Sequence, residues 1–182
     1  DVASPSRVLY GTAVGSLTSD VQDATLTTEH EITLTGLAPD RRYYYAIGTL
    51  ASVLEGDDAA HTFETSPTPG TAKPTRIWII GDAGTGTSEQ VAVRDAFVAY
   101  TGTRPADVWL MLGDNAYSDG TDSEYQAAVF NMYPQMLRKS VLWPTLGNHD
   151  GHSADSGTQT GPYYEIFTLP KNAEAGGIAS GT

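Results

Sequence analysis

The chain has 182 residues, and its ten Lys and Arg against 22 Asp and Glu give a formal net charge of −12. This acidic balance argues against binding to nucleic acid or to an anionic membrane surface, because the phosphates of either would repel the chain. Cysteine is absent, which excludes disulfide bonds, zinc–thiolate sites and a thiol nucleophile. No apolar run approaches the roughly 20 residues of a membrane-spanning helix. The 40% hydrophobic content is typical of a globular protein.

Residues 1–66 predict short strands separated by turns. Strand-like runs occupy residues 6–11, 28–34, 42–48 and 61–65. Helical periodicity is absent, so an all-β sandwich is the expected fold of this part. We expect the two His residues of this part, His30 and His61, to be exposed to solvent.

The stretch from Leu37 to Tyr43, with Leu-x-Pro-x-x-x-Tyr spacing, resembles the tyrosine corner of fibronectin type III-like domains. In that motif the Tyr hydroxyl bonds to the backbone just upstream, and we expect Tyr43 to do so. The alternative is that Tyr43–Tyr45 is only a β-favouring aromatic run. A sandwich of this type needs about seven strands, and this part supplies about four or five. The resemblance therefore implies that the first strands are missing.

Residues 67–74 contain three Pro and predict an extended linker. From residue 75 to 182 the pattern changes to strands alternating with helices, which predicts an α/β domain. We expect strands at 76–80, 107–112 and 141–146, the first two apolar enough to be covered on both faces. The third contains Pro144 and belongs at a sheet edge. Each strand carries a Trp that we expect in the core: Trp78, Trp109 and Trp143.

Two helices are expected in this second part. Thr87 and Gln90 form a predicted capping box, and Gly102 is placed to end the first helix. Its apolar stripe is spaced at i, i+3, i+4 and i+7 and should be buried; it comprises Val93, Ala96, Phe97 and Tyr100. The second helix should begin near residues 122–124 and end around Pro134.

Three strands end in similar polar clusters. Gly81-Asp82 follows the first strand, Gly113-Asp114 the second, and Gly147-Asn148-His149-Asp150 the third. Roughly 30 residues separate successive clusters, which is the length of one βαβ unit. Because ligand sites in open α/β sheets lie at the carboxyl ends of the strands, we expect Asp82, Asp114 and Asn148 to converge.

Oxygen-rich clusters of this kind suit hard cations. Asp82 and Asp114 could share one ion, or one carboxylate could bridge two. Tyr117 follows Asp114 closely enough to reach the same ion, and Asn148 offers a neutral oxygen for a second ion. His149 would then face the substrate, and Asp150 and His152 are left as loop residues or as supports of the ligands. Taken singly, each Gly-Asp is more often only a turn, so the prediction rests on the joint pattern.

The motifs Gly81-Asp82-Ala83-Gly84, Gly113-to-Tyr117 and Gly147-to-Asp150 resemble, in order and spacing, the first three motifs of purple acid phosphatases. These enzymes belong to the calcineurin-like metallophosphoesterases. A fibronectin-like β domain commonly precedes the catalytic domain in that family, which matches the order expected here. Gly161-Pro162-Tyr163-Tyr164 also resembles the segment after the third motif in bacterial-type members.

The resemblance implies a role for each matching residue. Asp82 and Tyr117 would bind a first metal, typically Fe(III), and Asp114 would bridge it to a second. Asn148 would bind that second, divalent metal, which is iron, zinc or manganese. His149 would stabilise the transition state or protonate the leaving alcohol. The implied reaction is acid phosphatase-type hydrolysis of a phosphate ester by a metal-bound hydroxide at the dinuclear centre, and tyrosinate bound to Fe(III) would colour the protein purple.

The family has two further motifs, Val-x-x-His and Gly-His-x-His, which supply three His ligands. This chain has four His in all, and none follows His152. The resemblance therefore implies a fragment that contains the N-terminal part of the catalytic domain. We expect such a chain to retain metal poorly and to have little or no activity by itself. A secreted or periplasmic parent protein is expected only from the family and from the β module.

Two other functions remain open. Gly81-to-Gly86 follows a strand and precedes a helix, as in a nucleotide-binding loop, but its Gly spacing is not G-x-G-x-x-G and no Gly-Lys-Ser/Thr follows. The second alternative is a non-enzymatic β-rich adhesion or interaction module that carries a degenerate catalytic remnant. Neither explains all three strand-end clusters as ligands.

Overall fold

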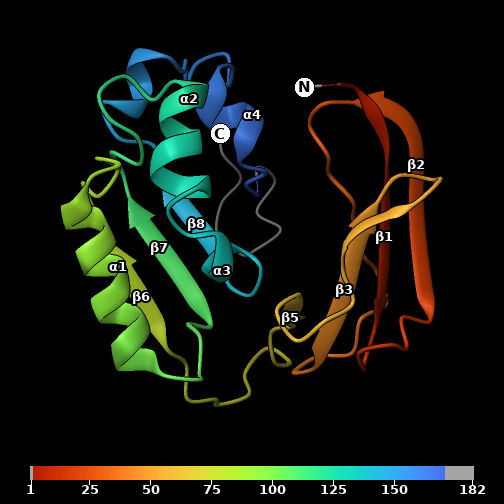
Figure 1. Ribbon diagram of the computed structural model, residues 1–182. Helices are drawn as coiled ribbons and strands as arrows, with labels where there is room; N and C mark the ends of the chain where they lie inside the picture. Colours follow the sequence, from red (N-terminus) through yellow and green to blue (C-terminus); the bar gives the residue numbers. More distant parts are fainter. Residues whose placement is uncertain (1, 171–182) are drawn as a thin grey trace. The chain divides into compact units, whose positions relative to one another are not determined.

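The structure is a computed structural model that describes residues 2–170 (Figure 1). It combines an antiparallel sheet and a parallel sheet with few helices. The strands are β1 (Ser4–Gly11), β2 (Ser19–Thr27), β3 (Arg42–Gly48), β4 (Val53–Gly56), β5 (Thr62–Glu64), β6 (Ile77–Ile80), β7 (Val108–Leu112) and β8 (Val141–Thr145). The α-helices are α1 (Ser88–Thr101), α2 (Asp122–Tyr125), α3 (Pro134–Leu137) and α4 (Pro162–Ile166).

Contacts divide the chain into two units. The first comprises Asp1–Trp78, Arg94–Trp109 and Tyr133–Leu142, and the second comprises Ile79–Val93, Leu110–Met132 and the residues from Trp143 on. The first unit holds the antiparallel sheet, and the second holds all three strand-end clusters. The boundaries expected from the sequence, at 66 and 75, stay a prediction.

The antiparallel sheet has the order β2-β1-β3-β4, and β5 pairs with β3. The strand predicted at residues 42–48 is confirmed, but the one predicted at residues 28–34 is wrong: that segment has no regular secondary structure. The sheet instead contains β2, which begins a few residues after β1 and pairs with it, Val21 opposite Val8, while β3 pairs with the other side of β1. A nearby segment closes a smaller loop and so pairs at lower entropic cost.

Tyr43 forms the expected corner. Its hydroxyl accepts a hydrogen bond from the Ala38 N–H at 2.9 Å, its side chain is buried, and its ring stacks on Phe63 with centroids 5.4 Å apart. The predicted hydroxyl-to-backbone bond is therefore confirmed.

His61 is buried, with 4% of its surface exposed, so the expectation of a solvated side chain is wrong. The Asp58 carboxylate lies 2.9 Å from His61 Nδ1 and also accepts the His61 N–H at 3.1 Å, which closes the turn and packs the ring edge-on against Tyr45. His30 is exposed, as expected.

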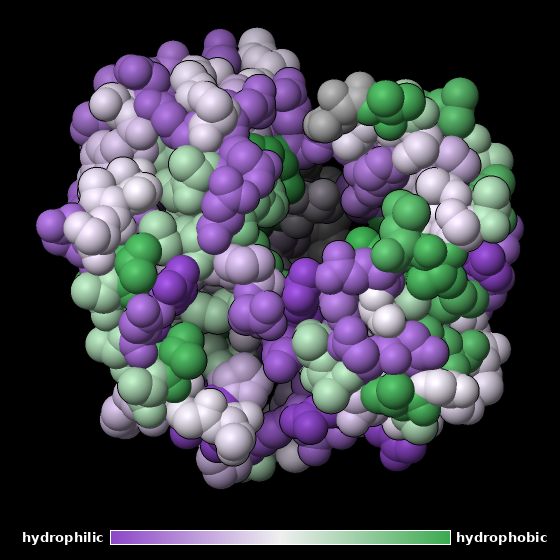
Figure 2. Space-filling model, viewed as in Figure 1, coloured by the Kyte–Doolittle hydropathy of each residue, from purple (hydrophilic) through white to green (hydrophobic). Residues whose placement is uncertain are grey.

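The antiparallel sheet leaves large apolar side chains in contact with solvent. Figure 2 shows hydrophobic residues gathered over its strands. Those exposed around the β3–β4 connection are Ile47, Leu50, Val53 and Leu54.

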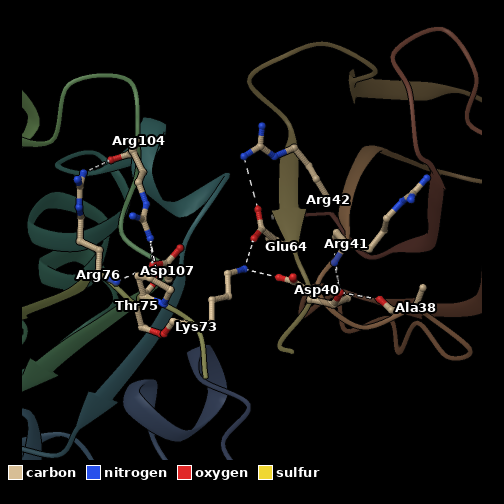
Figure 3. A network of polar contacts seen from close by, with 12 residues as sticks. Ala38, Asp40, Arg41, Arg42, Glu64, Lys73, Thr75, Arg76, Arg104 and Asp107 are labelled. Atoms are coloured by element: carbon tan, nitrogen blue, oxygen red, sulfur yellow. Dashed lines mark hydrogen bonds and ion pairs between the residues drawn. The ribbon is translucent and has the colours of Figure 1, made fainter. Parts of the chain in front are cut away.

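Polar contacts hold the C-terminal end of the linker (Figure 3). The Lys73 ammonium group pairs with the carboxylates of Asp40 and Glu64. On the following residues, the Arg104 guanidinium donates to the Pro74 carbonyl at 3.0 Å and pairs with Asp107 at 2.9 Å. Side chains thus fix the C-terminal end of the linker, where Pro74 offers no N–H of its own.

The second sheet has the order β6-β7-β8, so β8 lies at an edge of the described sheet, as its Pro predicts. Aromatic side chains cluster on one face of this sheet. Trp78 stacks on Phe97 of α1 with ring centroids 4.1 Å apart, and Trp109 contacts Tyr133 edge-on with ring centroids 4.7 Å apart. Trp78 and Trp109 are buried as expected, whereas Trp143 is only half-buried.

The sequence predicted that β6 would be covered on both faces, and for the described residues this prediction is wrong. Ile77 and Ile79 are 51% and 55% exposed, although Trp78 between them is buried. The prediction that the apolar face of α1 is buried is wrong as well. Val93 and Tyr100 are exposed, whereas Gln90 is buried and Phe97 is half-buried. The physical reason is that Phe97 and Tyr133 both pack against the ring of Trp78, so they cover only the side of the strand on which that ring lies.

The second predicted helix begins at Asp122, continues as the π-helix η1 (Gln126–Phe130), and ends before Pro134. Pro134 does not end it but starts α3, where a missing N–H costs nothing in the first turn. No helix in the described part of the chain has the length and apolarity needed to cross a bilayer.

Candidate functional site

The two candidate carboxylates follow β6 and β7 and share an uncommon backbone conformation. Asp82 has φ = 53° and Asp114 has φ = 51°, both in the left-handed region. Asp tolerates this region better than most residues, but it still carries a conformational cost of about 1 kcal/mol. Such outliers are enriched at functional sites, and two of them stand here at equivalent strand ends.

Backbone hydrogen bonds join the two strand ends. The Asp82 N–H donates to the Gly113 carbonyl at 3.1 Å, and the Gly84 N–H donates to the Asp114 carbonyl at 3.1 Å. The Tyr117 N–H completes the set with a 2.8 Å bond to the Gly84 carbonyl. A side chain at position 84 would lie 2.1 Å from the Asn115 carbonyl oxygen, so only Gly permits this approach.

The Tyr117 side chain brings both carboxylates together. Its hydroxyl lies 2.9 Å from Asp114 Oδ2, to which it donates, and 3.3 Å from Asp82 Oδ1. Burial, together with the hydrogen bond to Asp114, raises the pKa of the Tyr117 phenol above its usual range. Its proton therefore sits between two carboxylates, a position that a cation also favours.

The turn that follows β8 contacts the same carboxylate. The His149 N–H donates to Asp114 Oδ1 at 3.1 Å, and Asn148 precedes it as an exposed residue of that turn. Burial raises the pKa of Asp114, but the hydrogen bonds from His149 and Tyr117 outweigh it, and the net pKa is below the usual value. A Cβ at Gly147 would lie 2.0 Å from the Asp114 nitrogen and 2.2 Å from Asp114 Oδ1, so this turn fits against Asp114 only without a side chain.

His149 has one ring nitrogen engaged. Nδ1 lies 2.6 Å from the Ser118 carbonyl oxygen, and because a carbonyl only accepts, Nδ1 carries the hydrogen and donates. The ring packs against Tyr117 at 4.6 Å between centroids and against His152 at 5.4 Å. His152 Nδ1 in turn lies 3.0 Å from Asp119 Oδ1.

The structure thus brings Asp82, Asp114, Tyr117 and the His149 backbone into direct contact and puts Asn148 in the adjoining turn. Two further carboxylates organise these loops: sequence reasoning missed Glu124 and named Asp150 only as a loop residue or a support of the ligands. Glu124 accepts the Thr121 N–H at 2.9 Å, and the Thr-x-x-Glu capping-box pattern was the signal that could have identified it. Sequence reasoning assigned Asp150 no contact, because Tyr125 and Asn115 are remote from it in sequence.

The donor set consists of two carboxylates, a phenol and an amide, all hard oxygen ligands that suit an Fe(III) or a divalent cation. Among residues 2–170, no three His, Cys, Asp or Glu side chains gather in one group able to hold a metal ion. The candidate set contributes two such residues, and Tyr117 and Asn148 supply its other oxygens.

The loop that could cradle a nucleotide phosphate is already bonded. The Gly86 N–H donates to Gln90 Oε1 at 2.7 Å, and Gln90 Nε2 donates to the Ala128 carbonyl at 2.8 Å. The Gln90 side chain thus occupies the Gly86 N–H, a donor that a bound phosphate would need.

Comparison with known protein-family models finds no match for this chain, and no curated protein matches it significantly.

Proposed function

We propose that this chain supplies metal ligands to a dinuclear centre that hydrolyses phosphate esters, in a metallophosphoesterase of the purple acid phosphatase type. The observation that carries the proposal is the contact of the Tyr117 hydroxyl with both Asp82 and Asp114, each held in a left-handed conformation at a strand end. In the same proposal the antiparallel sheet belongs to a fibronectin-like sandwich and the parallel sheet to an α/β catalytic domain.

The residues present fit the proposed ions. Asp82 and Tyr117 would hold a first ion, Asp114 would bridge, and Asn148 would hold a second. When bound, the ions supply Lewis-acid activation of water and neutralise charge on the phosphoryl oxygens. Tyr117 must first give up the proton that it now donates to Asp114.

His149 supplies the group for the leaving alcohol. Its Nδ1–H is held by the Ser118 carbonyl, which fixes the ring and leaves Nε2 as the nitrogen that exchanges a proton. A protonated Nε2 can donate to an alkoxide as the ester bond breaks.

The proposal is tested by the binding of inorganic phosphate, measured by calorimetry with and without added Fe(III) and Zn²⁺. We expect phosphate to bind only in the presence of the metals. Asp114→Asn should weaken that binding at least tenfold, because it removes the bridging carboxylate. Asp155→Asn, which changes an exposed loop carboxylate by the same charge, is the matched control and should bind like wild type. Equal phosphate binding without metal, or equal binding by the two variants, would contradict the proposal.

Four donor side chains leave coordination positions of two ions to be filled by other groups. We therefore expect little or no turnover of an aryl phosphate by this chain alone, even with iron and zinc added. Robust turnover would show that these four donors suffice.

A second candidate function is a non-enzymatic interaction module. It is favoured by the exposed apolar side chains of the β3–β4 region, of which Leu54 is 69% exposed, since patches of this kind often mark contact surfaces. This function requires no metal, so identical behaviour of Asp114→Asn and wild type in every metal assay would favour it.

A further inference from the structure

Asp150 is a completely buried carboxylate whose contacts reach three segments of the second unit. Its Oδ1 accepts the Tyr125 hydroxyl at 2.7 Å, and its Oδ2 accepts the Gly147 N–H at 2.8 Å. Both oxygens accept the Asn115 N–H, at 3.1 and 3.2 Å, and Oδ1 also accepts the Ala116 N–H at 3.3 Å. One side chain therefore ties α2, the loop after β7 and the turn after β8 together.

Within residues 2–170, every hydrogen-bond partner of this carboxylate is a donor. The Asn115 side chain adds one more, from Nδ2 to Oδ2 at 2.9 Å. An acceptor-only group is needed here, because an amide would turn its NH₂ toward N–H or O–H groups whichever way it is oriented. Asn has nearly the same shape as Asp but would place a donor against these donors. If the side chain only filled space, Asn would serve equally well.

The segments that Asp150 joins are those that carry the candidate ligands. Asn115 and Ala116 lie between Asp114 and Tyr117, and Gly147 directly precedes Asn148. Asp150 contacts none of these three ligand residues in the hydrogen bonds described above. It acts on them through the backbone that holds them.

We infer that Asp150 is a positioning residue, which fixes the Asp114–Tyr117 loop to the Asn148–His149 turn and so sets the spacing of the metal ligands. The inference rests on the proposed function, which makes those residues ligands. Buried partners that orient metal ligands typically change metal affinity by about 10–100-fold when they are removed.

The first test is hydrogen exchange of the metal-free chain, which requires no metal site to exist. Asp150→Asn should speed amide exchange at least tenfold in residues 115–117 and 147–149 and leave β1 and β3 unchanged. Tyr125→Phe removes one donor and keeps the buried ring, so it should give a smaller change in the same segments even if Asp150→Asn folds poorly. Unchanged exchange in both variants would overturn the inference.

The second test asks whether the anchoring reaches the ligands. Ferric iron bound by a phenolate absorbs visible light, and the position of that band reports the geometry at Tyr117. We expect Asp150→Asn to shift or lose the band and to weaken iron binding at least tenfold, with a smaller effect in Tyr125→Phe and none in the charge-matched control Asp155→Asn. Faster exchange together with an unchanged band and affinity would overturn the positioning role.

The two tests separate the inference from the function on which it rests. If wild type develops no band and binds no metal, the proposed function fails, and Asp150 positions no metal site. The exchange data then still decide whether Asp150 joins the two loops.

Discussion

At the scale of single residues, the site is built from strained or crowded positions. Asp82 and Asp114 keep carboxylates where the backbone is left-handed and Gly would be less strained. Gly147 stands where any side chain would overlap Asp114. Local preference thus yields to the requirement that the two carboxylates and the turn after β8 meet, as is typical of functional sites.

The crowding at Gly147 gives a prediction with a close control. Gly147→Ala places a methyl group 2.0 Å from the Asp114 nitrogen, so the turn must move. We expect the free energy of unfolding to fall by about 1–3 kcal/mol and Zn²⁺ affinity to fall at least tenfold. Urea unfolding and a zinc titration measure both quantities.

Gly151→Ala in the same turn is the control, because a Cβ there meets nothing within 4 Å. It should stay within about 0.5 kcal/mol of wild type. If the two alanine variants had the same stability and zinc affinity, the close packing of the turn against Asp114 would be wrong.

At the scale of elements, the start of α2 organises the loop that holds His149. Glu124 accepts the N–H groups of Asp119 and Thr121 at 3.1 and 2.9 Å, and a third bond comes from the N–H of Ser118, whose carbonyl accepts His149 Nδ1–H. The bond from the Thr121 N–H is the largest cause that lowers the pKa of Glu124; burial opposes it, and the other bonds add to it. The helix cap is therefore also a support of the site.

This lowered pKa predicts a pH dependence of stability. Because the pKa of Glu124 is lower in the folded chain than in the unfolded one, its contribution is present above about pH 4.3 and is lost as the pH falls through the folded pKa. We expect Glu124→Gln to be less stable than wild type by about 1 kcal/mol at pH 6. The two should converge once the pH falls below the folded pKa of Glu124, where the carboxyl is protonated in both the folded and the unfolded chain.

Urea unfolding of both proteins at several pH values tests this prediction. A stability gap of constant size across the pH range would contradict it, since the effect would then not depend on ionisation of Glu124.

At the scale of the whole molecule, the sequence was most informative where the structure depends on local order. The strands at 42–48, 76–80 and 107–112 and the end of α1 near Gly102 follow from propensity, apolar runs and turn residues. The convergence of Asp82 and Asp114 followed from the direction of parallel strands. Tyr117 was predicted from its spacing to Asp114.

The predictions that proved wrong depend on contacts between residues that are far apart in the sequence. Which face of β6 is covered depends on where Phe97 and Tyr133 pack, and His61 packs against Tyr45 of β3. The sequence left open whether Asp150 is a loop residue or a support of the ligands, because its contacts with Asn115 and Tyr125 join segments 35 and 25 residues away. Periodicity contains no information on such pairings.

The central claim is that Tyr117 and the two carboxylates form a metal site, and visible absorption of the chain titrated with ferric iron tests it most directly. We predict a phenolate-to-iron band in wild type that Tyr117→Phe abolishes. Tyr100→Phe, at a phenol that is 84% exposed on α1, should leave the band intact. A Tyr117→Phe spectrum identical to that of wild type, or no band in wild type at all, would contradict the account.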